Sequence, residues 1–333
     1  MQRTNPNFDR PSGSHFPLLA ILTAALLLAG FSPLRSAAQE KGQKSFPSAE
    51  AASAALLMAV DSNDEKAMLA VLGPDAKPVI FTGSVDEDSE RHANFCRRYM
   101  QMHRLVNEPD GTTTLYIGAE NWPVPFPLVQ KGGAWYFDTE AGVKEIQYRR
   151  IGHNEMAAIH VCHELVAAEK EYYSRRNNVY AAKIASDAGQ KSGLYWPVSG
   201  TESESPIGPR IAAASVDEGA GSGSSASSRP VPFQGYFFGA LTRQGKAAPG
   251  GATDYVVNGK MTAGFAFLAY PAEYRVTGVM TFIVNRDGVV YEKDLGEKTA
   301  DLAKAIKEYD PDSTWHNVEE QSAQQTSSDQ NPK

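Results

Sequence analysis

The chain has 333 residues, of which 42% are hydrophobic and 21% are charged, a composition that is ordinary for a globular protein. This composition excludes wholesale disorder and a multi-pass membrane protein, and the length predicts about two domains. The formal net charge is −7, and a chain without basic runs lacks the phosphate-neutralising surface that nucleic-acid binding requires.

An apolar run from residue 16 to 31 follows two arginines and is shorter than a typical membrane-spanning helix. Ser36 and Ala38 then place small side chains at the positions that a signal peptidase recognises. The pattern predicts a signal peptide over residues 1–38, cleaved before Gln39, and an exported protein that is periplasmic or secreted and has no membrane contact after cleavage. A retained amino-terminal anchor is the alternative. The mature chain would keep 29 basic and 38 acidic residues, a net charge of −9.

The part of the chain after the predicted signal peptide is expected to begin with an α+β domain over residues 45–150. Dense alanine, leucine and methionine between residues 46 and 73 predict two helices. The sequence DSND marks the break between them, where Asp61 or Asn63 can cap the second helix. An amphipathic pattern over residues 86–106 predicts a third helix.

Strands complete this domain. The segment TTTLYIGA predicts one strand, and PFPLVQ and AWYFDTE, separated by a KGG turn, predict a hairpin. Prolines at positions 123, 125 and 127 cannot donate to a sheet, so this approach is expected at an edge. Helices followed by a small antiparallel sheet indicate the α+β class.

Four acidic residues open the third predicted helix: Asp86, Glu87, Asp88 and Glu90. Acidic side chains in a first helical turn interact favourably with the helix dipole, which is the preferred interpretation. A calcium loop would need a central glycine and regularly spaced oxygens, and the sequence has neither.

The second domain is predicted over residues 151–316. Asn154 is expected to cap a long helix that runs to about residue 176, followed by an extended connector. A stretch almost free of large apolar residues predicts a mobile loop over residues 212–230, and residues 317–333 predict a disordered tail.

Four successive strands are then expected to form an antiparallel β-meander. They are FQGYFFGALTRQG, KMTAGFAFLAYPAEY, GVMTFIVN and VVYEKDL. The last two flank NRDG, where Asp287 and Gly288 tolerate the left-handed backbone of a tight turn. The fold expected for the whole chain is therefore α+β: amino-terminal helices with a small antiparallel sheet, then a long helix and an antiparallel β-meander.

Several segments across most of the mature chain carry a family resemblance. They are WPVPFPLV with WYFDTEAG, RRIGHNE, YAAKIASDAGQKSGLYWP, ESPIGP, and GYFFGALTRQGKAAPGG with YPAEYRVTGVMTFIVNRDGVVYEKDLG. In these segments the chain resembles the exported bacterial family called domain of unknown function 2950. The resemblance implies an envelope or secreted protein that bears a signal peptide, and it implies no reaction.

The carboxyl-terminal half is also similar to the soluble heads of pilin-like and pseudopilin proteins. A long helix with EYYSRRNNVY leads there to strands ending in TGVMTFIVNRDGVVY. Those proteins keep an apolar assembly helix directly after leader cleavage, whereas here the apolar run precedes the predicted cut. Only the shape of the head would then carry over.

No nucleophile elbow, phosphate loop, dinucleotide glycine pattern or zinc-protease motif occurs in the sequence. A polar cluster is formed by Arg149, Arg150, His153 and Glu155. One interpretation is a small-anion or acid/base site, in which His153 titrates near neutrality and Glu155 orients it. The preferred alternative is a structural network that caps the long helix and joins the two halves.

Four aromatic residues lie beside prolines or glycines: Trp122, Trp135, Tyr195 and Trp196. Rigid aromatic faces in irregular segments suit contact with sugars or peptides, so Trp122, Tyr195 and Trp196 are binding candidates together with Arg149 and Arg150. Core filling is the preferred alternative for the aromatic rings.

His160, Cys162 and His163 form a metal-like cluster, but zinc needs three or four converging ligands. Cys162 and Glu164 would point elsewhere around the helix, so packing is preferred and no metal or other cofactor is predicted. In an oxidising compartment Cys96 and Cys162 can form a disulfide. Two buried thiols are the alternative.

These patterns predict an exported protein with a non-enzymatic binding or scaffolding role in the cell envelope. The partner is unknown, with an envelope protein or a cell-wall component as candidates. One alternative is a hydrolase or small-ligand enzyme that uses a cleft between the two halves, with His153 and Glu155 as its acid/base pair. Another is a pilin-like assembly subunit.

Overall fold

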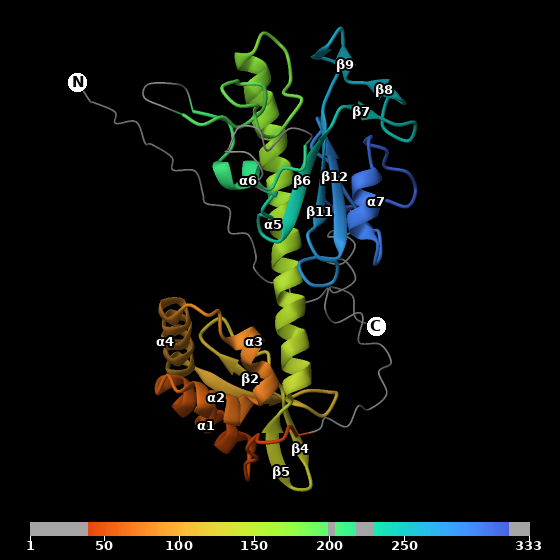
Figure 1. Cartoon of the computed structure of the whole chain (residues 1–333). Helices are drawn as coiled ribbons and strands as arrows, with labels where there is room; N and C mark the ends of the chain where they lie inside the picture. The colour runs from red at the N-terminus through yellow and green to blue at the C-terminus, as the bar shows by residue number, and fades with distance from the viewer. Residues whose placement is uncertain (1–38, 199–203, 218–228, 320–333) are drawn as a thin grey trace, which may run out of the picture.

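The computed structural model describes residues 39–198, 204–217 and 229–319, which form two packed regions joined by one long helix (Figure 1). The helices are α1 (Ala49–Asp61), α2 (Glu65–Leu72), α3 (Lys77–Ile80), α4 (Val85–Gln101), α5 (Thr139–Arg175), α6 (Pro209–Ala213) and α7 (Thr299–Ala305), with a 3-10 turn at Pro74–Ala76. The strands are β1 (His103–Asn107), β2 (Thr113–Ile117), β3 (Trp122–Pro123), β4 (Leu128–Lys131), β5 (Ala134–Phe137), β6 (Tyr236–Leu241), β7 (Arg243–Gln244), β8 (Thr253–Asp254), β9 (Val256–Val257), β10 (Lys260–Met261), β11 (Ala266–Pro271), β12 (Met280–Asn285), β13 (Val290–Asp294) and β14 (His316–Asn317). Helices together with antiparallel sheets confirm the α+β class.

The predicted signal peptide, residues 1–38, lies outside the described residues. In the part of the chain that is described, no helix has the length and apolar character needed to cross a membrane.

The first region begins with two helices, as the sequence predicts. The Ser48 hydroxyl accepts a hydrogen bond from the backbone N–H of Ala51 and so starts α1. The break falls at the expected place, but the residue that caps α2 is Asp64, whose carboxylate accepts from the backbone N–H groups of Lys66 and Ala67. Asp64 precedes the first helical residue directly, which is where a capping oxygen can reach these donors.

These helices cover an antiparallel sheet with the strand order β1-β2-β4-β5, in which β3 pairs with β2. Strands β4 and β5 form the predicted hairpin. The expected helix over residues 86–106 is wrong over its last turn, because α4 ends at Gln101 and residues 103–107 form β1. Leu105 pairs with Leu115 of β2, and this tertiary pairing outweighs the local helical pattern.

Helix α5 is the element that joins the two regions. Its 37 residues correspond to about 55 Å of helix. It begins at Asp138, whose carboxylate accepts from the N–H of Ala141 at 3.0 Å. The expected start at Asn154 is wrong: Asn154 lies buried in mid-helix and donates from its side chain to the carbonyl of Thr277 at 2.8 Å.

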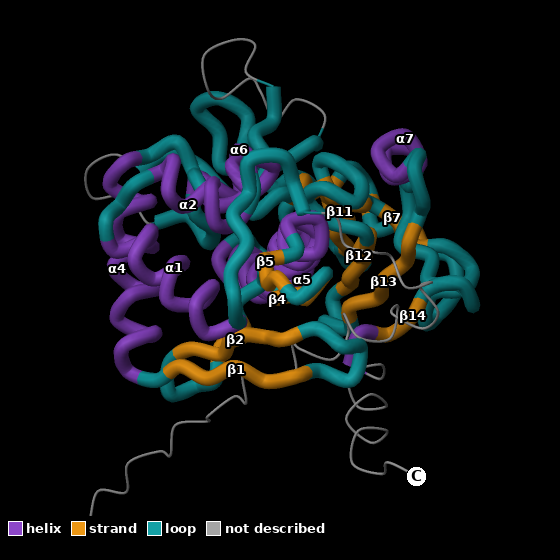
Figure 2. Tube along the Cα trace, turned by 90° about the horizontal axis from the view of Figure 1, so that it is seen from below, coloured by secondary structure: helices purple, strands orange, loops and turns teal. Residues whose placement is uncertain are grey.

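The second sheet has the order β14-β13-β12-β11-β6 and is antiparallel throughout, so the predicted meander is confirmed. Figure 1 shows α5 and α7 on opposite sides of β11 and β12. Both helices contact β11, whose six residues are all buried. Figure 2, which looks along α5, shows α1, α2 and α4 on one side of it and β11 to β14 on the other.

The connector after α5 folds back on itself, and its described residues form no helix or strand. Residues 212–217 follow it, and the sequence placed them in a mobile loop, whereas in the structure Ala214 and Ser215 are buried. The carbonyl of Ala214 accepts from the N–H of Phe238, and the N–H of Val216 donates to the carbonyl of Phe238. This segment therefore extends the edge of β6; residues 218–228 of the expected loop lie outside the described residues.

The two cysteines are free thiols in separate cores. Cys96 packs against the amino-terminal core, and Cys162 is fully buried in the core between α5 and the second sheet. The structure thus contradicts the hypothesis of a disulfide between them. Burial raises the pKa of the Cys162 thiol to about 12, so this group packs as a small apolar side chain.

Candidate functional site

A pocket of about 1140 Å³ lies beside the edge strand β6. One wall is the connector over residues 182–189, and another is formed by α6 with the segment that follows it. The opposite wall comes from α7 and from the residues directly after it. Three segments that are distant in sequence therefore meet at one edge of the second sheet.

Asp217 ties two of these walls to the sheet. One carboxylate oxygen accepts from the N–H of Ala240 at 2.7 Å, and the other accepts from the N–H of Ile184 at 2.6 Å. The Asp217 N–H donates to the hydroxyl of Ser215. Burial raises the pKa of Asp217, while the two backbone donors oppose that shift. The carboxylate supplies the edge of β6 and the connector with the acceptors that their backbone groups need.

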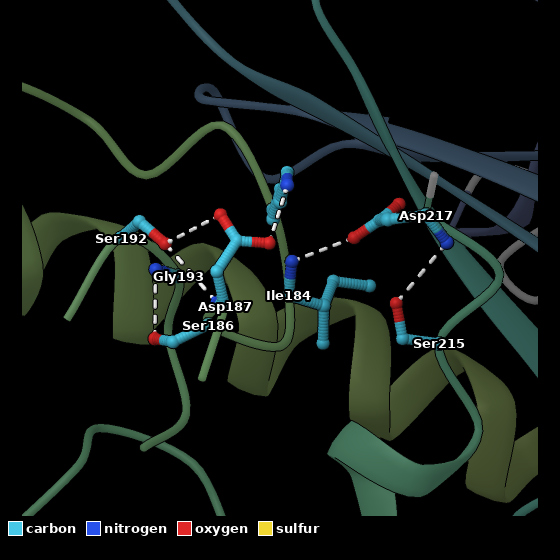
Figure 3. A network of polar contacts seen from close by, with 8 residues as sticks. Ile184, Ser186, Asp187, Ser192, Gly193, Ser215 and Asp217 are labelled. Carbon is cyan, nitrogen blue, oxygen red and sulfur yellow. Dashed lines mark hydrogen bonds and ion pairs between the residues drawn. The ribbon is translucent and has the colours of Figure 1, made fainter. Parts of the chain in front are cut away.

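Asp187 holds the turn of the connector in a second network (Figure 3). Its carboxylate pairs with the ammonium of Lys183 at 2.8 Å and accepts from the hydroxyl of Ser192 at 3.3 Å. The Lys183 hydrogen bond holds the pKa of Asp187 below its usual range. The N–H of Gly193 donates to the Ser186 hydroxyl, and a Cβ at Gly193 would lie 2.7 Å from the carbonyl carbon of Ala185. A larger residue at position 193 would push apart the two segments that flank the turn.

The pocket carries more positive than negative charge. Five cationic side chains line it: Lys183, Arg229, Arg243, Lys304 and Lys307. The carboxylates in the lining are Asp187 and Asp217, whose oxygens are engaged as described above.

Apolar groups complete the lining. Leu241, Leu268 and Tyr270 come from the sheet and are almost fully buried, and Ile306 comes from the end of α7. Such a mixture of apolar surface and a few charged groups is typical of small-molecule sites.

Several polar groups of the pocket already have hydrogen-bond partners. The lining contains no histidine and no cysteine. Its Ser186 and Ser215 hydroxyls both accept from backbone N–H groups, and the Lys183 ammonium is paired with Asp187.

Of the aromatic binding candidates, Tyr195 lines this pocket. Trp196 is buried, with the cations of Arg176 and Lys191 at 5.6 and 5.5 Å from its ring centre. Trp122 belongs to the other region, where it is 45% exposed. Core filling is thus the role of Trp196, while Trp122 remains accessible.

Arginines surround Trp122. The guanidinium of Arg149 lies 5.0 Å and that of Arg98 5.9 Å from its ring centre. Arg149 also donates to the carbonyl of Pro123 at 2.9 Å and pairs with Glu145. These contacts join α5 to β3 and support a structural role for Arg149. Trp135, the remaining aromatic, pairs with Gln130 in the β4–β5 hairpin.

The structure does not bring His153 and Glu155 together as an acid/base pair. One Glu155 oxygen accepts from the N–H groups of Val279 and Met280 at 2.8 and 3.0 Å, which fastens α5 to the start of β12. Burial raises the pKa of Glu155. His153 and Arg150 are exposed, and residues two apart in a helix point to different faces.

The histidine cluster on α5 is also divided. The His160 ring lies 3.1 Å from the carboxylate of Glu164 on the surface, His163 is exposed, and Cys162 is buried. Among the residues that the structure describes, no group of three or more histidine, cysteine, aspartate or glutamate side chains could hold a metal ion.

Sequence reasoning missed Asp217 and the lysines of the α7 wall. Asp217 belongs to a stretch poor in large apolar residues, and its partners are 23 and 33 residues away. The signal that could have found it is an acidic residue directly after the apolar Val216.

Two buried carboxyl groups were missed as well. Burial raises the pKa of Glu169 to about 8, and burial with the nearby charge of Glu155 raises that of Glu292 to about 7. Both follow apolar neighbours in a helix or strand, which local charge patterns do not distinguish from surface positions.

A protein-family model, described as "Protein of unknown function (DUF2950)", matches residues 43–318. This confirms the family resemblance seen in the sequence. No curated protein and no solved structure matches the chain, so the similarity to the heads of pilin-like proteins stays a prediction.

Proposed function

The chain belongs to the DUF2950 family, whose description names no activity, and we propose that it is an exported, non-enzymatic protein that binds a small ligand in the pocket beside β6. Export follows from the sequence of residues 1–38, which has the features of a signal peptide.

The observation that carries the proposal is a large pocket whose walls are fixed before any ligand arrives. Its volume of about 1140 Å³ is slightly above the range of typical small-molecule sites, roughly 300 to 1,000 Å³. Asp217 and Asp187 hold the walls through bonds to backbone and side-chain groups. Preformed walls lower the ordering cost of binding, which is what a binding protein needs.

The hydrolase alternative lacks the acid/base pair that it requires. It required His153 and Glu155 to act on one substrate, but Glu155 holds the backbone of β12 and His153 lies on the surface. The serines of the pocket are bonded to backbone donors. Binding without chemistry is the function that these contacts support.

A thermal-shift screen of the exported protein against cell-wall fragments, sugars, peptides and organic acids tests the proposal. A ligand at 100 times its Kd stabilises the folded state by about 2.7 kcal/mol, which raises Tm by about 4 °C for a chain of this size.

Two matched variants locate the binding. Ala213 is exposed and lines the pocket, so Ala213→Trp should place a large side chain in it and abolish the shift. Ala93 is exposed on α4 in the other region, so Ala93→Trp should leave the shift unchanged. A ligand that stabilises both variants equally would show that binding lies elsewhere and would refute the assignment of the pocket.

A further inference from the structure

We propose that the ligand of this pocket is an amphipathic anion: an organic molecule with an apolar body and a carboxylate, sulfonate or phosphate group. The inference rests on the proposed binding function and adds the chemical class of the ligand.

The charge of the pocket is opposite to the charge of the protein. The chain as a whole carries −7, yet five of the seven charged side chains in the pocket lining are cationic. A concave surface with an excess of cations attracts anions and raises their local concentration.

The negative groups of the lining are not available to cancel this charge at the α7 wall. Asp187 is neutralised by Lys183 at 2.8 Å. Asp217 directs its two oxygens to the N–H groups of Ile184 and Ala240. Asp187 is thus engaged within the connector, and Asp217 is engaged by the connector and β6.

The α7 wall supplies cations that are free to meet a ligand. Lys304 and Lys307 are exposed and form no ion pair with any residue that the structure describes. Arg243 beside them contacts Glu308 at 3.5 Å, with both side chains about half exposed. A lysine near the carboxyl terminus of a helix also interacts favourably with the helix dipole. This interaction does not explain why two lysines and an arginine from two segments line one wall of the pocket.

The apolar part of the ligand follows from apolar side chains in the lining that keep exposed surface. Tyr195, Val216 and Ile306 are partly buried, and Val231 is 63% exposed. A small inorganic anion would leave this surface in water. A molecule with a ring or chain next to its anionic group would cover it and gain from removing it from water.

A matched pair of fluorescent probes tests the inference directly. 1-Anilinonaphthalene-8-sulfonate carries a sulfonate, and N-phenyl-1-naphthylamine has the same ring skeleton without it. Fluorescence titration of the mature protein should show binding of the sulfonate probe at least tenfold tighter than binding of the neutral probe. Ala213→Trp should remove the binding of the sulfonate probe, because it fills the same space.

Charge variants identify the groups that hold the anion. In the double variant Lys304→Gln/Lys307→Gln, the sulfonate probe should bind about tenfold more weakly, since each partly exposed cation contributes roughly two- to fivefold. The neutral probe should change less than twofold. The control Lys66→Gln/Lys170→Gln removes the same net charge at exposed helical positions outside the pocket and should leave both probes unaffected.

The outcomes separate the two proposals. If both probes bind equally and Ala213→Trp removes both, the pocket binds ligands but the anionic class is wrong. If the charge variants have no effect, the inference is also overturned. If Ala213→Trp affects neither the probes nor any ligand from the thermal-shift screen, the binding function itself is refuted.

Discussion

Glu169 provides a quantitative test of the second core. Its side chain is fully buried on α5, and one carboxylate oxygen accepts from the N–H of Ala181 at 2.9 Å. The other oxygen has no hydrogen-bond partner among the residues that the structure describes. Burial therefore raises the pKa of this carboxyl from 4.5 to about 8, because a buried charge without a cationic partner is costly.

This raised pKa makes stability fall as the pH rises. Between pH 4.5 and about 8 the folded protein keeps a proton that the unfolded chain releases, so the folded state binds more protons over this interval. The Glu169 contribution is fully present below pH 4.5 and is lost as the pH passes 8. At about 1.4 kcal/mol for each pH unit, the loss is at most about 5 kcal/mol.

The substitution Glu169→Gln isolates this effect. Its amide oxygen can still accept from Ala181, but the side chain no longer titrates. Urea unfolding of the wild type and the variant should be followed between pH 4 and 9. The free energy of unfolding of the variant, minus that of the wild type, should rise by about 3 to 5 kcal/mol from pH 5 to pH 9.

Using the difference removes the contributions of Glu155, Asp217 and Glu292, whose raised pKa values act in the same direction in both proteins. The control is Glu171→Gln, on the same helix but exposed and paired with Arg175. Its difference from the wild type should stay nearly constant across the pH range. Parallel curves for wild type and Glu169→Gln would refute the reasoning.

Three further predictions concern two glycines, the two cysteines and the amino terminus. Gly142→Ala should lower the free energy of unfolding by about 1 to 3 kcal/mol, because its Cβ would lie 2.0 Å from the Phe126 ring. Gly152→Ala has open space around it and should raise the free energy of unfolding by about 0.5 to 1 kcal/mol. Urea titrations that gave the same sign for both variants would contradict the packing. Alkylation of the unfolded protein without reductant should add two groups by intact mass, at Cys96 and Cys162, and no addition would indicate a disulfide after all. Amino-terminal sequencing of the exported protein should begin at Gln39, and a start at Met1 would argue against cleavage.

Local patterns predicted the elements whose caps and turns are local. The hairpin of β4 and β5 and the meander of β6, β11, β12 and β13 follow from alternation and from turns such as the one at Gly288, whose φ is 83°. The start of α5 was missed because its first turns contain Gly142 and its length depends on distant contacts. Phe126 packs against that glycine, and the polar residues that looked like a helix start lie in mid-helix.

The candidate site was less accessible to sequence reasoning than the fold. Tyr195 was identified, since an aromatic residue beside glycine and proline is visible locally. The pocket itself depends on three segments that meet only through tertiary contacts, and α7 begins almost sixty residues after the end of β6. Lys304 and Lys307 look like ordinary surface lysines until the sheet places them opposite the connector.

Asp217 is the residue on which both the pocket and the edge of the sheet depend. Strand β6 is the last strand of its sheet, and exposed backbone donors on such an edge can pair with another chain. The Asp217 carboxylate occupies the N–H of Ala240 and the N–H of Ile184 at once. Asp217→Ala would leave two backbone donors without partners.

Asp217→Ala should therefore lower the free energy of unfolding substantially. Each orphaned donor costs about 1 to 3 kcal/mol, so Asp217→Ala should lower the free energy of unfolding by about 2 to 5 kcal/mol and abolish binding of the sulfonate probe. Asp217→Asn keeps one acceptor and should lose about half as much stability. Ser215→Ala removes a single 3.3 Å bond and should cost less than about 1 kcal/mol. If Asp217→Ala unfolds at the same urea concentration as Ser215→Ala, the carboxylate does not hold the connector to β6, and the pocket wall must depend on other contacts.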